Sequence, residues 1–268
     1  MGNTIQQAVS SSGSLLAKTP LAYPANNPTA GSECHHNYDR ITAFAVSLGR
    51  ERLHPPLRNP DYLVLKERRE HFSEWLLRVP GEKLSVLDVG GRIQPYRPLV
   101  ESRLQRYIAI DPMATGLVDA VAVGEQLPFP DESFDLVICS QVLCYADDPT
   151  QVVNEMHRVL RLGGTLLVSA PALFPSHAEK DRWRFIPQQM LSLLSCFSDV
   201  EVRPEGYSIA GIFRILATYL EFCIQGKSLR RVANSLLIPL VNRVGERLDR
   251  WSRGDTRFTT NYCACARK

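Results

Sequence analysis

The sequence lacks several features that would place it in a specialised class of protein. No apolar run comes near the roughly 20 residues that a membrane-spanning helix needs. No charged segment followed by an apolar core stands at the N-terminus, so we expect no secretory signal. With 44% hydrophobic and 22% charged residues and no low-complexity tract, the 268 residues have the composition of one globular α/β domain with extra helices.

Charge and cysteine content also exclude several classes of protein. A net charge of +3 is too small to indicate a nucleic-acid partner, and no stripe of aromatic and basic residues suited to stacking bases is present. The seven cysteines are an odd number and fall mostly in apolar runs, so we expect no disulfide framework and a cytoplasmic, reducing location. Cys263 and Cys265 share one face of a strand-like run with no second pair nearby. We interpret them as buried structural thiols and expect no metal site.

The chain divides into three parts by composition. Residues 1–36 are rich in Ser, Asn, Pro and Ala without a sustained period, which predicts a flexible N-terminal arm. Residues 37–82 are predicted to form an N-terminal helical cap, whose clearest helix, at about 61–79, carries an apolar stripe and ends at Pro80-Gly81. Residues 83–268 are predicted to form the main domain, with a helical insertion at about 209–251.

Short apolar runs alternate with helical stretches in the main domain, which predicts a parallel sheet with helices on both faces. The predicted strands are 84–89, 107–111, 118–123, 134–139, 165–169 and a region near 200–203, with a last β-prone run at 258–266. Helices are predicted at about 149–160 and 187–196. We find no internal repeat.

The segment from Val86 to Asp111 carries the strongest functional pattern. A buried strand ends in Gly90-Gly91, where the backbone can approach a ligand at the carboxyl edge of the sheet. About twenty residues later the next strand ends in Asp111, whose carboxylate can accept hydrogen bonds from both hydroxyls of a ribose. Together they indicate a ligand that contains adenosine.

Two details favour S-adenosylmethionine over a dinucleotide. The G-x-G-x-x-G turn that holds a pyrophosphate is absent. Asp88 stands two residues before the first glycine, where a carboxylate would repel a pyrophosphate but attract an amino group and a sulfonium. The alternative for Asp88 is a cap on the following turn.

Four blocks resemble the class I S-adenosylmethionine-dependent methyltransferases, in the broad type-11 methyltransferase-domain group. They are VLDVGGR, YIAIDP, GEQLPFPDESFDLVICSQVL, and EMHRVLRLGG followed by TLLVSAP, and they cover roughly 100 residues. The resemblance implies a Rossmann-like fold with a seven-stranded, mostly parallel sheet, helices on both faces, an antiparallel last strand and S-adenosylmethionine as methyl donor. It implies that Gly90 and Gly91 line the methionine moiety of the donor and that Asp111, with Pro112 after it, holds the ribose. By the same resemblance, Gly124 and Glu125 lie along the adenine, and Ser140 and Gln141 close the site.

The sequence departs from the family pattern at three places. Arg92, Ile93 and Gln94 stand where further glycines are usual, and Arg92 either binds the carboxylate of the ligand or points to solvent. Val123 replaces the usual acid after the third strand, which leaves the adenine to Glu125 or to backbone groups. Cys144-Tyr145 replaces a common Glu-His pair.

Candidate acid–base residues follow the fourth and fifth strands. His177 is the candidate base, with Tyr145 and Asp181 as alternates, because these loops leave the edge of the sheet where sites form. In the alternative interpretation, Asp181 and Arg184 form a structural ion pair while Trp183 and Phe185 anchor the loop.

The insertion before the last strand has two interpretations. Residues 227–257 contain eight basic and three acidic residues and the apolar run 236–241. The insertion forms either a helical cap with a basic outer face, or a lid or peripheral membrane element that receives a lipid-linked or anionic acceptor.

The sequence therefore predicts a methyltransferase that acts on a small-molecule acceptor by O- or N-methylation, of natural-product, sugar or lipid-linked type. The alternatives are an S-adenosylmethionine-binding pseudoenzyme or regulatory partner and, third, a nicotinamide-dependent oxidoreductase. The acceptor and the oligomeric state are not readable from the sequence.

Overall fold

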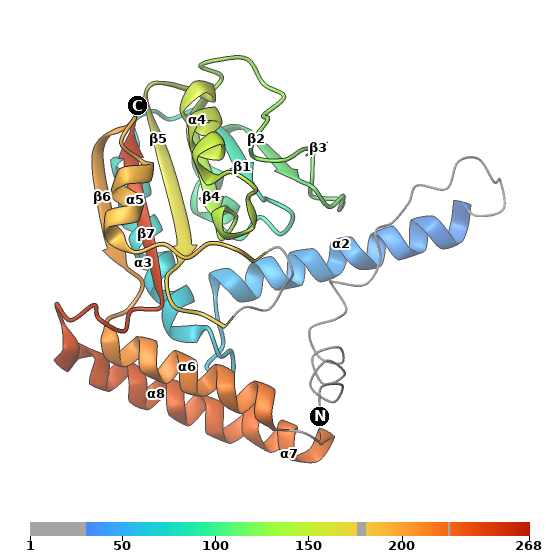
Figure 1. Cartoon of the computed structure of the whole chain (residues 1–268). Coiled ribbons are helices and arrows are strands. Elements are labelled where there is room, and N and C mark those ends of the chain that lie inside the picture. The colour runs from blue at the N-terminus through green and yellow to red at the C-terminus, as the bar shows by residue number, and fades with distance from the viewer. Residues whose placement is uncertain (1–30, 176–180, 225) are drawn as a thin grey trace, which may run out of the picture.

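The computed structural model describes residues 31–175, 181–224 and 226–268, and the strands among them form one mixed sheet (Figure 1). The seven strands are β1 Leu84–Val89, β2 Leu104–Asp111, β3 Ala120–Val121, β4 Phe134–Ser140, β5 Leu160–Pro171, β6 Ser198–Pro204 and β7 Asn261–Arg267. Their order is β3-β2-β1-β4-β5-β7-β6, and β7 runs antiparallel to both of its neighbours. The other pairs are parallel. The predicted Rossmann-like sheet with an antiparallel last strand is confirmed.

Helices surround this sheet and fill the insertion before β7. They are α2 Gly31–Leu53, α3 Tyr62–Arg78, α4 Pro149–Val159, α5 Pro187–Leu193, α6 Ser208–Cys223, α7 Lys227–Val232 and α8 Ile238–Asp249, with a π-helical stretch, Ala233–Leu237, between α7 and α8. Short 3-10 turns occur at Arg97–Leu99, Glu101–Arg103, Leu143–Tyr145 and Arg250–Ser252. α2 begins inside the segment predicted as an arm that ends at residue 36, and residues 1–30 of that arm lie outside the described residues. None of the described helices combines the length and apolar content required to cross a bilayer.

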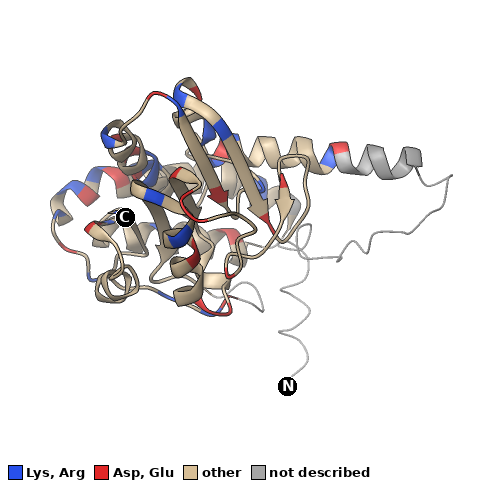
Figure 2. Cartoon of the chain, turned by 90° about the horizontal axis from the view of Figure 1, so that it is seen from above, with Lys and Arg blue, Asp and Glu red and all other residues tan. Residues whose placement is uncertain are grey.

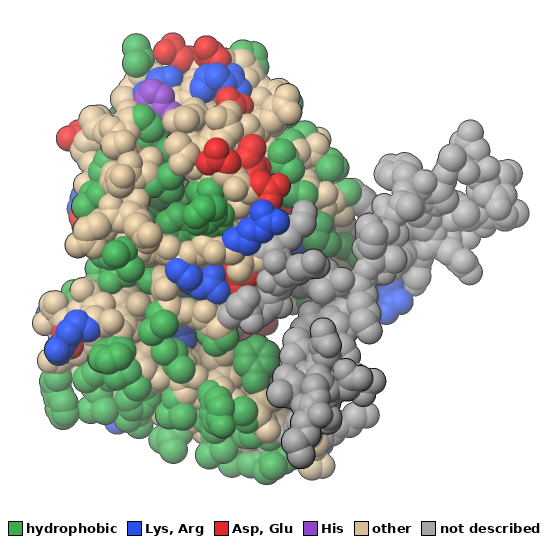
Figure 3. All heavy atoms as spheres, viewed as in Figure 1, with side chains coloured by type: hydrophobic (Ala, Val, Ile, Leu, Met, Phe, Trp, Pro, Cys, Tyr) green, Lys and Arg blue, Asp and Glu red, His purple; other side chains and the backbone are tan. Residues whose placement is uncertain are grey.

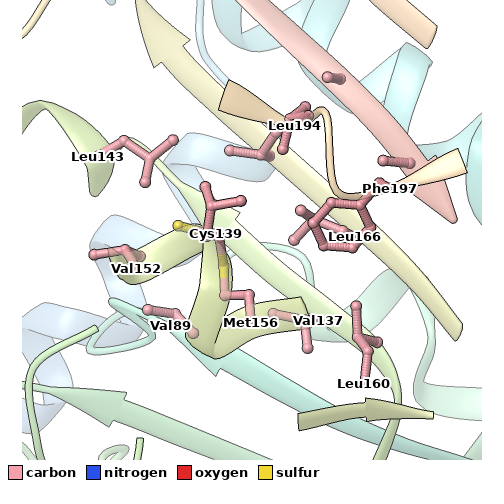
Figure 4. Close-up of a cluster of buried hydrophobic side chains, with 14 of the residues drawn as sticks. Val89, Val137, Cys139, Leu143, Val152, Met156, Leu160, Leu166, Leu194 and Phe197 are labelled. Carbon is pink, nitrogen blue, oxygen red and sulfur yellow. The ribbon is translucent and has the colours of Figure 1, made fainter. Parts of the chain in front are cut away.

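Strand side chains alternate between two hydrophobic clusters, one on each face of the sheet. On one face, Val89, Val137 and Cys139 pack with α4 residues such as Met156 (Figure 4). On the other face, neighbouring residues of β1 and β4, including Val86, pack against the aromatic residues of α3. The continuous apolar runs of the central strands follow from this burial on both sides.

Cys263 and Cys265 belong to the second face, as the spacing of two along β7 requires. Cys263 is buried and Cys265 is half-buried. Both carry free thiols. The prediction that they are structural thiols within the core is confirmed.

The start of α4 shows how the sequence sets local structure. The Asp148 side chain accepts hydrogen bonds from the backbone N–H groups of Thr150 and Gln151, at 2.9 and 3.2 Å. Pro149 occupies the first helical position, where its missing N–H costs nothing. This cap fixes the loop that leaves the carboxyl end of β4.

α2 lies against the loops at the carboxyl edge of the sheet. The Thr42 hydroxyl of α2 accepts a hydrogen bond from the backbone N–H of Gly116, 2.9 Å away, in the loop after β2. Gly49 leaves no room for a side chain, since a Cβ there would lie 2.0 Å from the carbonyl oxygen of Ile93. α6 and α8 lie below the carboxyl end of β5 in Figure 1. Basic and acidic residues are interspersed over the view in Figure 2.

Candidate cofactor and acceptor site

The turn after β1 has no space for side chains. Gly90 has φ +79°, a conformation that favours glycine, and a Cβ there would lie 2.2 Å from Val142 Cγ2. A Cβ on Gly91 would lie 2.8 Å from Cγ of Asp88. The backbone N–H groups of Gly90 and Gly91 both donate to the carbonyl of Ile110, at 2.8 and 2.9 Å. This pairing brings the glycine turn to the end of β2, beside Asp111.

Asp88 is a buried carboxylate beneath this turn. It is 3% exposed, and its Oδ2 accepts a hydrogen bond of 2.6 Å from the hydroxyl of Tyr107. Burial raises the pKa of Asp88 to about 7, the Tyr107 hydrogen bond opposes this shift, and the charge of Asp111 adds to it. The carboxyl group can therefore lose or keep its proton near neutral pH, and a nearby cation would favour the ionised form. Tyr107 was missed in the sequence, because nothing local links a strand tyrosine to this acid.

Asp111 ends β2 with a carboxylate at the edge of the sheet. Its Oδ1 accepts a hydrogen bond of 2.8 Å from the backbone N–H of Met113, and no other hydrogen bond reaches it within the described residues. Burial raises its pKa, while the Met113 hydrogen bond and the charge of Arg92 lower it. Pro112, directly after it, is exposed. The carboxylate has acceptor capacity left for hydroxyl groups of a ligand.

The residues that replace further glycines tie the loop to its surroundings. The Thr115 hydroxyl donates to the carbonyl of Arg92 at 3.2 Å, and the Gln94 side chain donates to the carbonyl of Leu117. The guanidinium of Arg92, which is half-buried, lies 2.8 Å from the sulfur of Met113. The loop after β1 is thus fixed to the loop after β2. The part of Arg92 in binding a carboxylate stays a prediction.

The predicted site residues of the third and fourth strands reach the same edge. A Cβ on Gly124 would lie 3.0 Å from Val152 and 3.5 Å from Val89, so Gly124 packs closely beside the end of β1. Glu125 Oε1 accepts a hydrogen bond of 2.8 Å from the backbone N–H of Asp147, so this carboxylate anchors the loop before α4. Contact with an adenine would then come from the backbone at this position.

Ser140 and Gln141 join a buried polar cluster that the sequence did not predict. The backbone of Gln141 has φ +60°. Its side-chain amide donates to the Ser169 hydroxyl at 2.8 Å, and that hydroxyl donates to Glu205 at 2.7 Å. Glu205 also accepts two hydrogen bonds from the guanidinium of Arg68, at 2.7 and 2.8 Å. Arg68 in turn lies 3.4 Å from the Ser140 hydroxyl.

Arg68 and Glu205 form the centre of this cluster and have almost no exposed surface. Burial alone would lower the pKa of Arg68, but the charge of Glu205 outweighs it and holds the pKa above its usual value. Arg68 comes from α3 and Glu205 follows β6, so the pair connects the N-terminal cap to the sheet. An arginine within the charged run 66–70 of α3 gave no sequence signal for this role.

The three candidate acid–base residues have different outcomes. His177 lies outside the described residues. The Asp181 carboxylate is 2% exposed and pairs with the guanidinium of Arg184 at 2.6 and 2.9 Å, as the alternative interpretation proposed. Trp183 also anchors the loop, since its indole N–H donates to the carbonyl of Ala146 at 2.8 Å.

Tyr145 keeps its proton at neutral pH. Burial raises the pKa of its hydroxyl to about 12, and the charges of Cys144 and Asp181 add to the shift. Such a hydroxyl serves as a hydrogen-bond donor better than as a base. Its catalytic part stays a prediction.

A polar cavity of about 300 Å³ lies between the N-terminal cap and the helical insertion. It is lined by Glu51, Arg58, Asn59, Pro60, Asp61, Phe174, Thr218, Glu221 and Asn234. Three of these residues carry carboxylates. Burial raises the pKa of Glu221, and Asp61 pairs with the guanidinium of Arg214 at 2.8 Å.

Two side-chain atoms of residues that line the cavity are buried without a hydrogen-bond partner among the described residues. They are Thr218 Oγ1 on α6 and Asn234 Oδ1 in the π-helical stretch. Leaving such atoms unpaired costs about 1–3 kcal/mol each. A ligand in the cavity could satisfy both, and this makes the cavity a candidate acceptor site.

Arg52 is a half-buried arginine of α2. It follows the cavity residue Glu51 at the end of α2. Burial lowers its pKa, the charge of Arg68 adds to the shift, Asp61 opposes it, and Arg92 also lowers it. The charges of Arg68, Asp61 and Arg92 therefore all act on its guanidinium.

Comparison with known proteins finds methyltransferases similar to the central part of the chain. Residues 87–168 match the family model described as a methyltransferase domain. A Methanocaldococcus jannaschii protein, MJ1123, is 40% identical over 106 residues, which are 40% of this chain and 51% of that protein. A methyltransferase of a Mycobacterium species is 35% identical over 100 residues, 34% of this chain and 39% of that protein. A crystal structure of an S-adenosylmethionine-dependent methyltransferase from Archaeoglobus fulgidus is 15% identical, with a TM-score of 0.46 over 75% of this chain and 94% of that one.

The central part of the chain is a class I S-adenosylmethionine-dependent methyltransferase domain. The family match, the strand order and the glycine turn beside a strand-terminal acid all agree on this assignment. The matched segments span about half or less of the length of these curated relatives. The cap, the insertion and the cavity lie outside the matched residues.

Proposed function

We propose that the chain transfers the methyl group of S-adenosylmethionine to a small acceptor bound in the polar cavity. The observation that carries the proposal is the pair of buried carboxylates, Asp88 and Asp111, at a glycine turn with no room for side chains. A cradle of backbone with acids on two sides suits a ligand with a cationic half and a ribose.

Each part of the cradle would hold one part of the donor. Asp111 would accept the ribose hydroxyls, Asp88 would attract the amino group and the sulfonium through the turn, and Arg92 would meet the carboxylate. The bound donor supplies a methyl group that is already activated. The protein's part is then to hold the acceptor in line with it and to exclude water.

The lining of the cavity favours acceptors that donate hydrogen bonds. Glu51, Glu221 and the Asn234 amide oxygen offer acceptor atoms, whereas Arg58 is the one cationic residue of the lining among the residues that the structure describes. Amines and polyhydroxylated molecules complement such a lining, and an anionic acceptor would be repelled. An amine or hydroxyl acceptor must lose a proton for methyl transfer. Because Tyr145 stays protonated and Asp181 is held in an ion pair, His177, which lies outside the described residues, stays the candidate base.

Titration calorimetry with S-adenosylmethionine and, separately, with NAD tests the first step. We expect micromolar binding of S-adenosylmethionine and none of NAD. Binding of NAD alone would favour the oxidoreductase alternative. Binding of the donor without transfer to any acceptor would favour the pseudoenzyme.

A second experiment tests the cavity. Transfer of labelled methyl to a panel of amines and polyols, against carboxylic acids and phosphates, should succeed only in the first group. Thr218→Val, which removes a hydrogen bond, and Glu221→Gln, which removes the charge of an acceptor, should each raise KM for that acceptor about tenfold, while donor affinity stays unchanged. Glu132→Gln, on the exposed turn before β4, is the matched control. Equal KM values for all four proteins would place the acceptor elsewhere.

A further inference from the structure

An apolar face covers the outside of the helical insertion. On α6, Ile212, Leu216 and Tyr219 recur at i, i+4 and i+7, and all three are exposed. On the π-helical stretch and beyond α8, Leu236 is 65% exposed and Trp251 is 83% exposed. Figure 3 shows hydrophobic side chains gathered over this part of the molecule. Exposed apolar patches of this kind mark interaction sites.

The charged residues of α6 are turned away from this face. Arg214 is buried against Asp61 and lies 4.3 Å from the ring centre of Phe174. Glu221 lines the cavity. The solvent side of α6 therefore carries no charge over its whole length, which is unusual for a helix at a protein surface.

The arginines of α8 and of the 3-10 turn after it stand on the same side as the exposed leucines of α8 and the π-helical stretch. Arg243, Arg247 and Arg250 are exposed and follow Leu236 and Leu240 at helical spacing. Within the described part of the chain, none of these three guanidinium groups takes part in an ion pair or a hydrogen bond. The outer side of α8 is therefore both apolar and basic.

The acids of α8 point the other way. Glu246 accepts hydrogen bonds from Lys66 at 2.6 Å and Tyr62 at 3.3 Å, both on α3. Asp249 accepts from the backbone N–H groups of Tyr207 and Ala210, at 3.0 and 2.7 Å. The excess of positive charge that the sequence shows in 227–257 is thus concentrated on the outside.

We propose that the outer face of α6, the π-helical stretch and α8 binds the surface of an anionic lipid bilayer. Leucine, tyrosine and tryptophan side chains would enter the boundary between headgroups and acyl chains, and the arginines would meet lipid phosphates. A second copy of this chain fits the face less well. A two-fold interface would set the unpaired arginines of both copies against each other.

Sedimentation with vesicles tests this proposal on the full chain. One set contains phosphatidylcholine only, and the other contains phosphatidylcholine with phosphatidylglycerol. We expect binding to the anionic set, weaker binding to the neutral set, and release at high salt. Leu236→Glu with Leu240→Glu should reduce the bound fraction at least tenfold, and Arg243→Gln with Arg247→Gln should reduce affinity for the anionic set about 30-fold.

Matched controls lie at the opposite edge of the sheet. Leu162→Glu, at a leucine that is 77% exposed, and Arg267→Gln should bind vesicles like the unmodified protein. Thermal melting and S-adenosylmethionine affinity should stay unchanged in all variants, so failure here is separate from failure of the proposed activity. The proposal is overturned if the unmodified protein stays in the supernatant. It is also overturned if the arginine variant binds anionic vesicles as well as the unmodified protein does. A different outcome would assign the face to a second copy of the chain. In that case ultracentrifugation would show a dimer, Leu236→Glu with Leu240→Glu would dissociate it, and no vesicle binding would be seen.

Discussion

Replacing Asp88 by Asn should remove a pH-dependent cost from the folded protein. Burial raises the pKa of Asp88 from about 3.8 to about 7. Below pH 4 the carboxyl group is protonated in the folded and unfolded chains, so it contributes nothing to the difference between the two proteins. Between pH 4 and 7 the unfolded chain releases the proton first, and the unmodified protein therefore loses stability as the pH rises.

The magnitude follows from the size of the shift. A change of about three pKa units corresponds to about 4 kcal/mol, because each unit corresponds to about 1.4 kcal/mol. The free energy of unfolding of Asp88→Asn minus that of the unmodified protein should thus increase by about 4 kcal/mol from pH 4 to pH 8. The amide keeps an oxygen that can accept the Tyr107 hydrogen bond.

Urea unfolding at a series of pH values measures this difference directly. Asp39→Asn, at an exposed position of α2, is the control and should give a flat difference. A flat difference for Asp88→Asn as well would refute the reasoning, since the carboxyl group would then titrate alike in the folded and unfolded chains. If bound S-adenosylmethionine places its cation near Asp88, ligand binding should release protons at pH 6–7 and this release should vanish in the variant.

Three further changes test other parts of the site. Asp111→Ala should weaken S-adenosylmethionine binding by about 2 kcal/mol in calorimetry, because it removes hydrogen bonds to a partly buried diol, and unchanged affinity would place the ribose elsewhere. Glu205→Gln should lower the free energy of unfolding by about 3–5 kcal/mol in urea, because it leaves Arg68 buried without a countercharge, and a loss below about 1 kcal/mol would contradict this. Gly90→Ala should abolish donor binding at a temperature where circular dichroism still reports a folded chain, since the added Cβ meets Val142; retained affinity would mean that the turn adapts.

Much of the fold was predictable because each pattern is local. The strand runs, the glycine turn and the helix that starts at Pro149 give their signals within a few residues, and the structure places them as predicted. The observed bounds of an element differ from the predicted ones where the sequence pattern was weak. The predicted third strand of six residues is reduced to Ala120–Val121, because it pairs with β2 at two positions only.

The convergence of the predicted cofactor residues on one edge of the sheet was also readable from the sequence. Gly90, Gly91 and Asp111 end neighbouring parallel strands, and this topology alone brings them to one edge. The function of the departures from the family pattern was not readable. Arg92 and Gln94 belong to the loop after β1, which is hydrogen-bonded to Thr115 and Leu117 in the loop after β2. These contacts depend on how the two loops pack, which no local pattern shows.

The sequence by itself determined the fold class, the methyltransferase domain and the edge of the sheet where a donor would bind, because these depend on periodicity and on residues close to strand ends. Only the tertiary structure decided the rest. Arg68 meets Glu205 across 137 positions of the chain, and Arg214 meets Asp61 across 153. Such contacts, and the cavity and outer face that result from them, depend on side-chain packing between distant segments, which no local pattern specifies.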